Sequence, residues 1–267
     1  MRLVCADALS MKLTRSMRRW MSALLVVLLS GIAAAVPQPA AGAAGSSYSL
    51  SYQSGSGAVL RWNPCQRAIT YRVNLRYAGS SATARSSALA DVKGAITKLS
   101  AATGIRFAYL GGTTRIPSGS TWWQHTGDAE LIVAWVNQNR SSSRSSLLLH
   151  AGSSYTAATG GWWSWQWGSV GTSAALVRGY VVVNARDNSK LRAGFGSGTT
   201  RGGLLMHELG HVVGLNHARE SSQLMYPVLL ARSKAAYATG DLAGLSRVGR
   251  RAGCISIPAN VGAPKDL

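Results

Sequence analysis

Three of the five histidines in this chain of 267 residues fall within eleven residues, from His207 to His217. His207 and His211 belong to the string HELGH, among apolar residues spaced as on the buried face of a helix. Side chains four residues apart on a helix share one face at about 5–6 Å, so these two imidazoles can bind one metal ion. Gly214 can adopt a positive φ that ends the helix, after which the chain can turn and bring His217 in as a third ligand.

This ligand set predicts a catalytic metal site rather than a structural one. Three neutral imidazoles leave a tetrahedral Zn²⁺ with one open position, which water fills, and zinc lowers the pKa of such a water to about 7. Glu208 is adjacent to the ligand His207 and can accept the proton. Ordinary histidines with an incidental glutamate are the alternative. The extended pattern fixes five residue types in the helical context that the motif requires, which favours the zinc site.

The sequence patterns of the rest of the chain predict one α+β domain, in which helices pack on a twisted sheet. Alternating β-branched residues predict a strand at 69–75, and apolar residues at helical spacing predict a helix at 82–103 that stops at Gly104. Further strands are expected at 105–110, 131–136 and 180–184, a Ser/Arg-rich loop at 137–159, and helices from 199 or 200 to 214 and from 239 to 248.

The N-terminal segment is typical of an exported protein. Basic residues precede an uncharged apolar run from Ala23 to Val36, and an A-x-A site follows, which predicts a signal peptide over residues 1–43. An uncleaved membrane anchor is the alternative, but the run is shorter than the roughly 20 residues that a spanning helix needs. We expect a flexible Ser/Gly-rich leader at 44–57, the folded domain at 58–258, a tail at 259–267, and a secreted, extracellular protein.

The cysteines support an oxidising location. Cys5 lies in the predicted signal peptide, so only Cys65 and Cys254 remain in the mature chain. An even pair in an exported protein predicts one disulfide. The alternative is that Cys65 is a free thiolate that blocks a metal.

The chain is strongly basic, with 28 Lys+Arg against 9 Asp+Glu and a net charge of +19. Without residues 1–43 it keeps 23 basic and 8 acidic residues, a net charge of +15. Such a charge favours polyanionic surfaces, among them wall polymers, anionic lipid and nucleic acid. The basic residues are mostly scattered singly, however, which favours an ordinary solvated surface. We expect a monomer with no specific nucleic-acid partner and no membrane contact after signal removal.

Four tryptophans fall within six residues: Trp162, Trp163, Trp165 and Trp167. The last three would share one face of a strand. They could form a stacking platform for a glycan or for aromatic side chains, although covering the core or a loop is the more usual role of such a stripe.

The string HELGHVVGLNH, followed by Leu224-Met225-Tyr226-Pro227, resembles the metzincin zinc endopeptidases and, within them, the matrixins. The eight-residue step from His217 to Met225 is matrixin-like, and the segment from Asp241 to Leu245 is similar to the last helix of that fold. The resemblance implies a metzincin-like twisted mixed β-sheet with long helices. It also implies an active-site helix ending at Gly214, followed by a Met-turn and a C-terminal helix.

The resemblance also implies the roles of the site residues. Those roles are the zinc ligands His207, His211 and His217, the general base Glu208, the hydrophobic floor Met225 and the Met-turn contact Asp241. It implies a secreted zinc endopeptidase that acts on protein or peptide substrates, which would pair as extended chains with an edge strand, for which residues 160–165 are the candidate. The alternative is a non-catalytic or weakly catalytic glycan- or polyanion-binding protein on the same scaffold.

The chain departs from the matrixin pattern at several positions. The family's Pro-x-Tyr after the Met-turn reads Pro227-Val228-Leu229 here, which changes the pocket for the residue after the cleaved bond. A second, structural zinc would need three more histidines, and only His125 and His150 remain. Calcium needs clustered carboxylates, and the acidic residues of this chain are widely spaced. We therefore expect one catalytic zinc ion and neither a structural zinc nor calcium.

Overall fold

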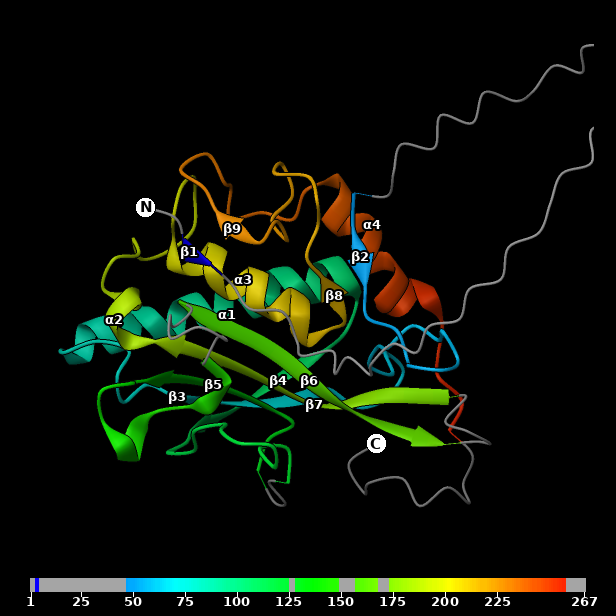
Figure 1. Ribbon diagram of the computed structural model, residues 1–267, viewed down its shortest axis with the longest axis horizontal. Coiled ribbons are helices and arrows are strands. Elements are labelled where there is room, and N and C mark those ends of the chain that lie inside the picture. The colour runs from blue at the N-terminus through cyan, green and yellow to red at the C-terminus, as the bar shows by residue number, and fades with distance from the viewer. Residues whose placement is uncertain (1–2, 5–46, 125–127, 149–156, 168–172, 258–267) are drawn as a thin grey trace, which may run out of the picture. The chain divides into compact units, whose positions relative to one another are not determined.

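A five-stranded mixed β-sheet lies at the centre of the fold, with the strand order β4–β3–β5–β7–β6 (Figure 1). The strands are β3 (Ile69–Asn74), β4 (Phe107–Gly112), β5 (Leu131–Val136), β6 (Ala158–Trp167) and β7 (Ser173–Asn184). Neighbouring strands run parallel except β6, which is antiparallel to β7 and forms one edge. This computed structural model describes residues 3–4, 47–124, 128–148, 157–167 and 173–257.

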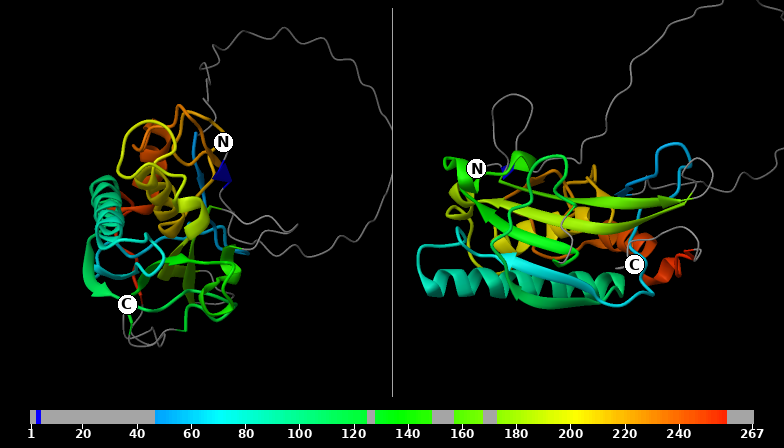
Figure 2. Two further views of the ribbon diagram at one scale, coloured as in Figure 1. Left: turned by 90° about the vertical axis from the view of Figure 1, so that its left-hand side faces the viewer. Right: turned by 90° about the horizontal axis from the view of Figure 1, so that it is seen from below.

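The longest helices of the described residues are α1 (Ala82–Thr103), α3 (Arg201–Val212) and α4 (Thr239–Val248). Helices α1 and α3 pack side by side on one face of the sheet (Figures 1 and 2). A buried ion pair joins them, in which Arg201 Nε lies 2.7 Å from Asp91 Oδ2. The expected mixed α+β class is confirmed. The short elements are α2 (Ala185–Asn188), η1 (Ser141–Ser143), η2 (Ser146–Leu148), η4 (Arg250–Ala252), β1 (Leu3–Val4), β2 (Ser49–Leu50), β8 (Leu215–Asn216) and β9 (Val228–Leu229).

Helix α1 has the bounds that its sequence predicts. The Ser81 hydroxyl accepts a hydrogen bond from the Ala84 N–H and caps the first turn. Gly104 ends the helix with a φ of 71°, in the left-handed region where glycine is favoured. The apolar positions at helical spacing, Val92, Ile96 and Leu99, are buried against the sheet and α3.

Strands β6 and β7 are longer than the sequence predicts. β7 begins at Ser173 rather than at residue 180, because Gly179 weakens the strand pattern before Tyr180. In the fold this glycine is required, since a Cβ at that position would lie 2.8 Å from the Val212 side chain of α3. β6 begins at Ala158, inside the segment expected to be a loop, and residues 149–156 of that loop are outside the described residues.

The tryptophans of β6 lie on both sides of the sheet. Trp162 packs against the main core between the sheet and the helices, and Trp167 is buried. Trp163 lies in a smaller apolar cluster with Trp122 and Tyr180, and its ring stacks on that of Trp123 at a centroid distance of 4.2 Å. Trp162 and Trp163 therefore pack against other apolar side chains, which is the more usual role of such a stripe of aromatic residues.

The close crossing of β6 over α3 depends on Gly160, because a Cβ there would collide with the carbonyl oxygen of Glu208. We expect Gly160→Ala to lower the free energy of unfolding by roughly 1–3 kcal/mol, since overpacking forces the strand and helix apart. Gly112→Ala is the control, because its Cβ would lie 3.8 Å from its nearest neighbour, an ordinary contact. Urea denaturation measures both variants, and equal stabilities would contradict the contact.

The leader expected to be flexible at 44–57 is held against the fold from residue 47 onward. Its strand β2 pairs antiparallel with β8, and Leu50 is buried in the main core. The Ser51 N–H donates to the Gly214 carbonyl oxygen at 2.8 Å. The Ser/Gly-rich composition suggested a linker, but alternate residues of this segment find backbone and core partners in the segment after α3.

The expected disulfide is present between Cys65 and Cys254, which are 189 residues apart in sequence. It joins the segment before β3 to the segment after η4. Arg61 adds to the same junction, because its guanidinium donates to the Gly253 carbonyl oxygen at 2.8 Å. The start and end of the folded domain are thus tied together.

Most of the predicted signal peptide and the tail 259–267 lie outside the described residues. The exception is β1, which pairs antiparallel with β9. Cleavage of residues 1–43 would remove β1 and leave this edge of β9 without that partner. No helix in the part of the chain that the structure describes is both long and apolar enough to cross a membrane.

Candidate metal centre

Three imidazoles converge at one point beside α3. His207 and His211 lie one turn apart on that helix, and His217 follows β8. The Nε2 atom of His211 lies 3.1 Å from that of His207 and 3.2 Å from that of His217. Nitrogen ligands at about 2.0–2.1 Å from a tetrahedral Zn²⁺ are separated by about 3.3 Å, so the three Nε2 atoms fit this ion. The structure thus brings together the three histidines that the sequence predicts as ligands.

Backbone carbonyl groups orient two of these rings. His207 Nδ1 lies 2.8 Å from the Leu224 carbonyl oxygen, and His211 Nδ1 lies 2.8 Å from the Leu215 carbonyl oxygen. A carbonyl oxygen can only accept, so each Nδ1 carries the proton and donates it. Each Nε2 then presents its lone pair toward the common point, which is the tautomer that a metal requires.

The surroundings keep His207 neutral. Burial lowers the pKa of His207 well below its ordinary value, and the neighbouring imidazoles of His211 and His217 lower it further. The hydrogen bond to the Leu224 carbonyl opposes this shift. A neutral imidazole at neutral pH can bind a metal without first losing a proton.

Glu208 is the acidic residue of the HELGH string and is completely buried on α3. Its backbone carbonyl faces Gly160 of β6, so the edge strand crosses α3 at this residue. Burial raises the pKa of Tyr180, and the negative charge of the Glu208 carboxylate raises that pKa further. Glu208 therefore follows His207 directly in the sequence, and its backbone faces the edge strand.

Met225 contacts helix α3, and Asp241 holds the backbone of the segment that carries Met225. The Met225 side chain packs against Gly210, whose missing Cβ leaves room for the sulfur atom. The Asp241 carboxylate accepts hydrogen bonds from the N–H groups of Leu224, Met225 and Ala238 at 2.7, 3.1 and 2.9 Å. Burial raises the pKa of Asp241, and these three donors oppose the rise. Asp241 therefore holds the backbone of the segment whose Leu224 carbonyl orients His207.

This arrangement makes Asp241 a support of the metal centre. We expect Asp241→Ala to leave two buried N–H groups and one half-buried N–H group without this acceptor and to cost roughly 2–4 kcal/mol of stability. Zinc affinity should also fall by about 10–100-fold, because the carbonyl that orients His207 loses its support. Zinc titration and thermal unfolding measure the two effects. The control is Asp187→Ala, which removes a buried carboxylate on α2 whose ion pairs are with Arg186 and Lys190. Unchanged zinc affinity in Asp241→Ala would contradict the role.

The end of α3 differs slightly from the expectation. The helix ends at Val212 rather than at Gly214, and Gly214 follows with a φ of 106°. A Cβ at Gly214 would also collide with the Leu60 carbonyl oxygen, so the turn toward His217 needs a glycine for both reasons. The buried Trp62 indole N–H donates to the Val212 carbonyl oxygen at 2.8 Å and satisfies the last turn.

Several supporting groups carried no signal in the sequence. They are the carbonyls of Leu215 and Leu224, the Trp62 indole, and Tyr237, whose hydroxyl donates to the Met206 carbonyl oxygen at 2.9 Å. Backbone carbonyls are present at every residue, so no pattern marks the ones that are used. His125 and His150 are outside the described residues, so the expectation of a single zinc ion stays a prediction.

A mixed α+β fold with two histidines on a helix and a third after it is compatible with the metzincin class of zinc metallopeptidases. Residues 197–248, which carry α3, the segment after it and α4, match the family model described as Matrixin. The resemblance to the matrixins is thus confirmed for the segment that holds the metal centre. None of the curated proteins compared matches the chain. The match and the triad together indicate a zinc metallopeptidase.

Proposed function

We propose that this protein is a secreted zinc endopeptidase that hydrolyses peptide bonds with Glu208 as general base. The observation that carries the proposal is the convergence of three Nε2 atoms within the segment that matches the matrixins, with the buried Glu208 next to His207 in the sequence. Zinc held by His207, His211 and His217 would supply a water of lowered pKa and polarise the peptide carbonyl. The decisive experiment is a peptide-library cleavage profile of the mature form, repeated with Glu208→Ala.

The chain's own residues perform the proton transfers and the positioning. Glu208 accepts the proton of the attacking water and donates it to the leaving amine. Its burial favours this role, because a carboxylate that is shielded from bulk water is a stronger base. The carbonyls of Leu215 and Leu224 hold two ligand imidazoles in the required tautomer throughout. Met225, packed beneath Gly210, forms the apolar floor of the centre, the role of a Met-turn.

The edge strand β6 is the proposed place for the substrate backbone. It has one neighbour, β7, in the five-stranded sheet and crosses α3 at Glu208. An extended peptide can add to such an edge by main-chain hydrogen bonds, which places a peptide bond near the histidine cluster. Residues 160–165, the candidate from sequence, lie within this strand.

The alternative is a glycan- or polyanion-binding protein without catalysis on the same scaffold. Two features favour the enzyme. Glu208 is retained, although a protein that only binds has no use for a buried carboxylate beside the ligands. The ring of Trp163 is stacked on Trp123, so one face of the candidate glycan platform is already covered.

A further inference from the structure

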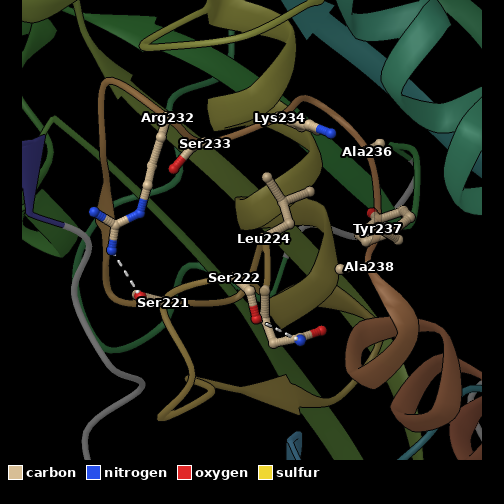
Figure 3. A pocket seen from close by; sticks show the side chains of 10 residues that line it. Ser221, Ser222, Leu224, Arg232, Ser233, Lys234, Ala236, Tyr237 and Ala238 are labelled. Atoms are coloured by element: carbon tan, nitrogen blue, oxygen red, sulfur yellow. Dashed lines mark hydrogen bonds between the residues drawn. The ribbon is translucent and has the colours of Figure 1, made fainter.

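A pocket of about 460 Å³ lies between residues 221–224 and 232–238 (Figure 3). We call it the loop pocket. Leu224 lies at its centre in the view of Figure 3, with Arg232 on one side and Lys234 and Tyr237 on the other. The wall that carries Lys234 is held by backbone pairing, because the Gly198 N–H donates to Ser233 and the Ala235 N–H donates to Gly196. The pocket is therefore built on fixed backbone.

The lining is cationic. Arg232 donates a hydrogen bond to the Ser221 hydroxyl at 2.8 Å, a neutral partner that leaves its charge uncompensated. Lys234 forms no ion pair within the described part of the chain. Among the described residues that line the pocket, none is acidic. The nearby carboxylate of Asp241 accepts from the backbone of 224, 225 and 238, so both of its oxygens are engaged there.

Two contacts connect the loop pocket to the metal ligands. The carbonyl of Leu224, whose side chain lines the pocket, accepts the hydrogen bond from His207 Nδ1. The hydroxyl of Tyr237, another lining residue, donates to the carbonyl of Met206, the residue before His207. Two lining residues, Leu224 and Tyr237, therefore contact His207 or the residue before it.

We propose that the loop pocket binds a carboxylate side chain of the substrate, so that Arg232 and Lys234 give the enzyme a preference for glutamate or aspartate close to the cleaved bond. The inference rests on the proposed function. Two cations and the hydroxyls of Ser221 and Ser222 supply the donors that a carboxylate needs. A neutral or basic side chain would leave both charges unpaired or repelled, which is the origin of the selectivity.

The test uses amidated peptides that carry either glutamate or glutamine at each position within two residues of the cleaved bond. At one position the mature wild-type protein should show about a tenfold higher kcat/KM for glutamate, the size expected for a hydrogen bond to a charged group. In Arg232→Gln/Lys234→Gln the ratio should fall close to one. The matched control Arg144→Gln/Arg251→Gln removes two exposed charges that do not line the pocket and should keep the tenfold ratio.

A binding measurement separates this inference from the proposed function. The same peptides, now carrying a fluorescent label, are titrated with the Glu208→Ala protein and followed by fluorescence anisotropy. The glutamate peptide should bind more tightly than the glutamine peptide, because that variant keeps the pocket. One outcome is that the wild-type protein hydrolyses no peptide while the binding preference persists and depends on Arg232 and Lys234. In that case the proposed function fails and the pocket assignment stands. If hydrolysis occurs with a glutamate-to-glutamine ratio near one at every position, only the pocket assignment fails.

One further arm tests the source of the carboxylate. A neutral peptide with a free C-terminus carries a single carboxylate at its end and is compared with its amide. If only the free C-terminus is preferred, the pocket recognises a chain end, and the assignment to side chains is overturned. A preference for internal glutamate in amidated peptides supports it. The glutamate preference should also weaken as salt is raised, since the cations are exposed and screened.

Discussion

Glu208→Ala is expected to abolish casein or gelatin cleavage, with a loss of about 100- to 10,000-fold in kcat or more, while zinc stays bound. The loss follows because general acid–base catalysis contributes about this factor and no other carboxylate lies in the HELGH segment. Zinc should stay bound because Glu208 is not one of the three converging histidines, and the Nδ1 atoms of His207 and His211 keep their hydrogen bonds to the Leu224 and Leu215 carbonyls. Cleavage assays and metal analysis on the same sample measure the two quantities.

The matched control for this variant is Glu220→Ala, which removes an exposed carboxylate from the segment after the ligands and should keep full activity. Circular dichroism of both variants checks that the fold survives. Full activity in Glu208→Ala would refute the role of Glu208 as the base. Loss of zinc from it would show that the carboxylate is a ligand, contrary to the geometry of the three Nε2 atoms.

Removal of zinc is expected to silence the enzyme and to lower its thermal stability. Zinc at 1,000 times its dissociation constant adds about 4 kcal/mol to the folded state, which for a domain of this size shifts Tm by roughly 8–16 °C. The effect is large because the buried imidazoles of His207 and His211 converge on a site that exists only in the folded chain. Differential scanning calorimetry and peptide cleavage, with and without a chelator, measure the two losses.

Zinc added back should restore both activity and Tm, and metal analysis should give one ion per chain. His211→Ala serves as the genetic counterpart, since it removes the imidazole whose Nε2 lies 3.1 and 3.2 Å from those of His207 and His217. Its Tm should no longer respond to zinc. Undiminished proteolysis in the presence of the chelator would refute the metallopeptidase function.

Local sequence patterns predicted the helices well. Helix α1 begins at its Ser81 cap and ends at Gly104 as expected, because both signals act within one turn of the helix. The i, i+4 spacing of His207 and His211 likewise places them on one face of a helix by geometry alone. The glycine after α3 was recognised for the same reason, since the φ of 106° at Gly214 is a property of one residue.

Patterns were weaker for the sheet, because a strand depends on partners that are distant in sequence. The extent of β7 was underestimated, since Gly179 reads as a break until α3 is seen against it. The segment at 47–57 reads as a linker from composition, yet it pairs with β8, more than 160 residues away. No local rule predicts such pairing, because its free energy comes from surface buried between remote segments.

The sequence by itself predicted the histidine triad, the expected base and the disulfide pair, because these predictions depend on residue type, on spacing within a short segment and on the oxidising compartment. Only the tertiary structure decided what supports them. The carbonyls of Leu215 and Leu224 reach two of the histidines, the Asp241 carboxylate binds the Met225 N–H, and the cations of the loop pocket gather, because folding brings separate segments into contact. Hydrogen bonds and charges act over a few ångströms in space, whatever the separation of the residues along the chain.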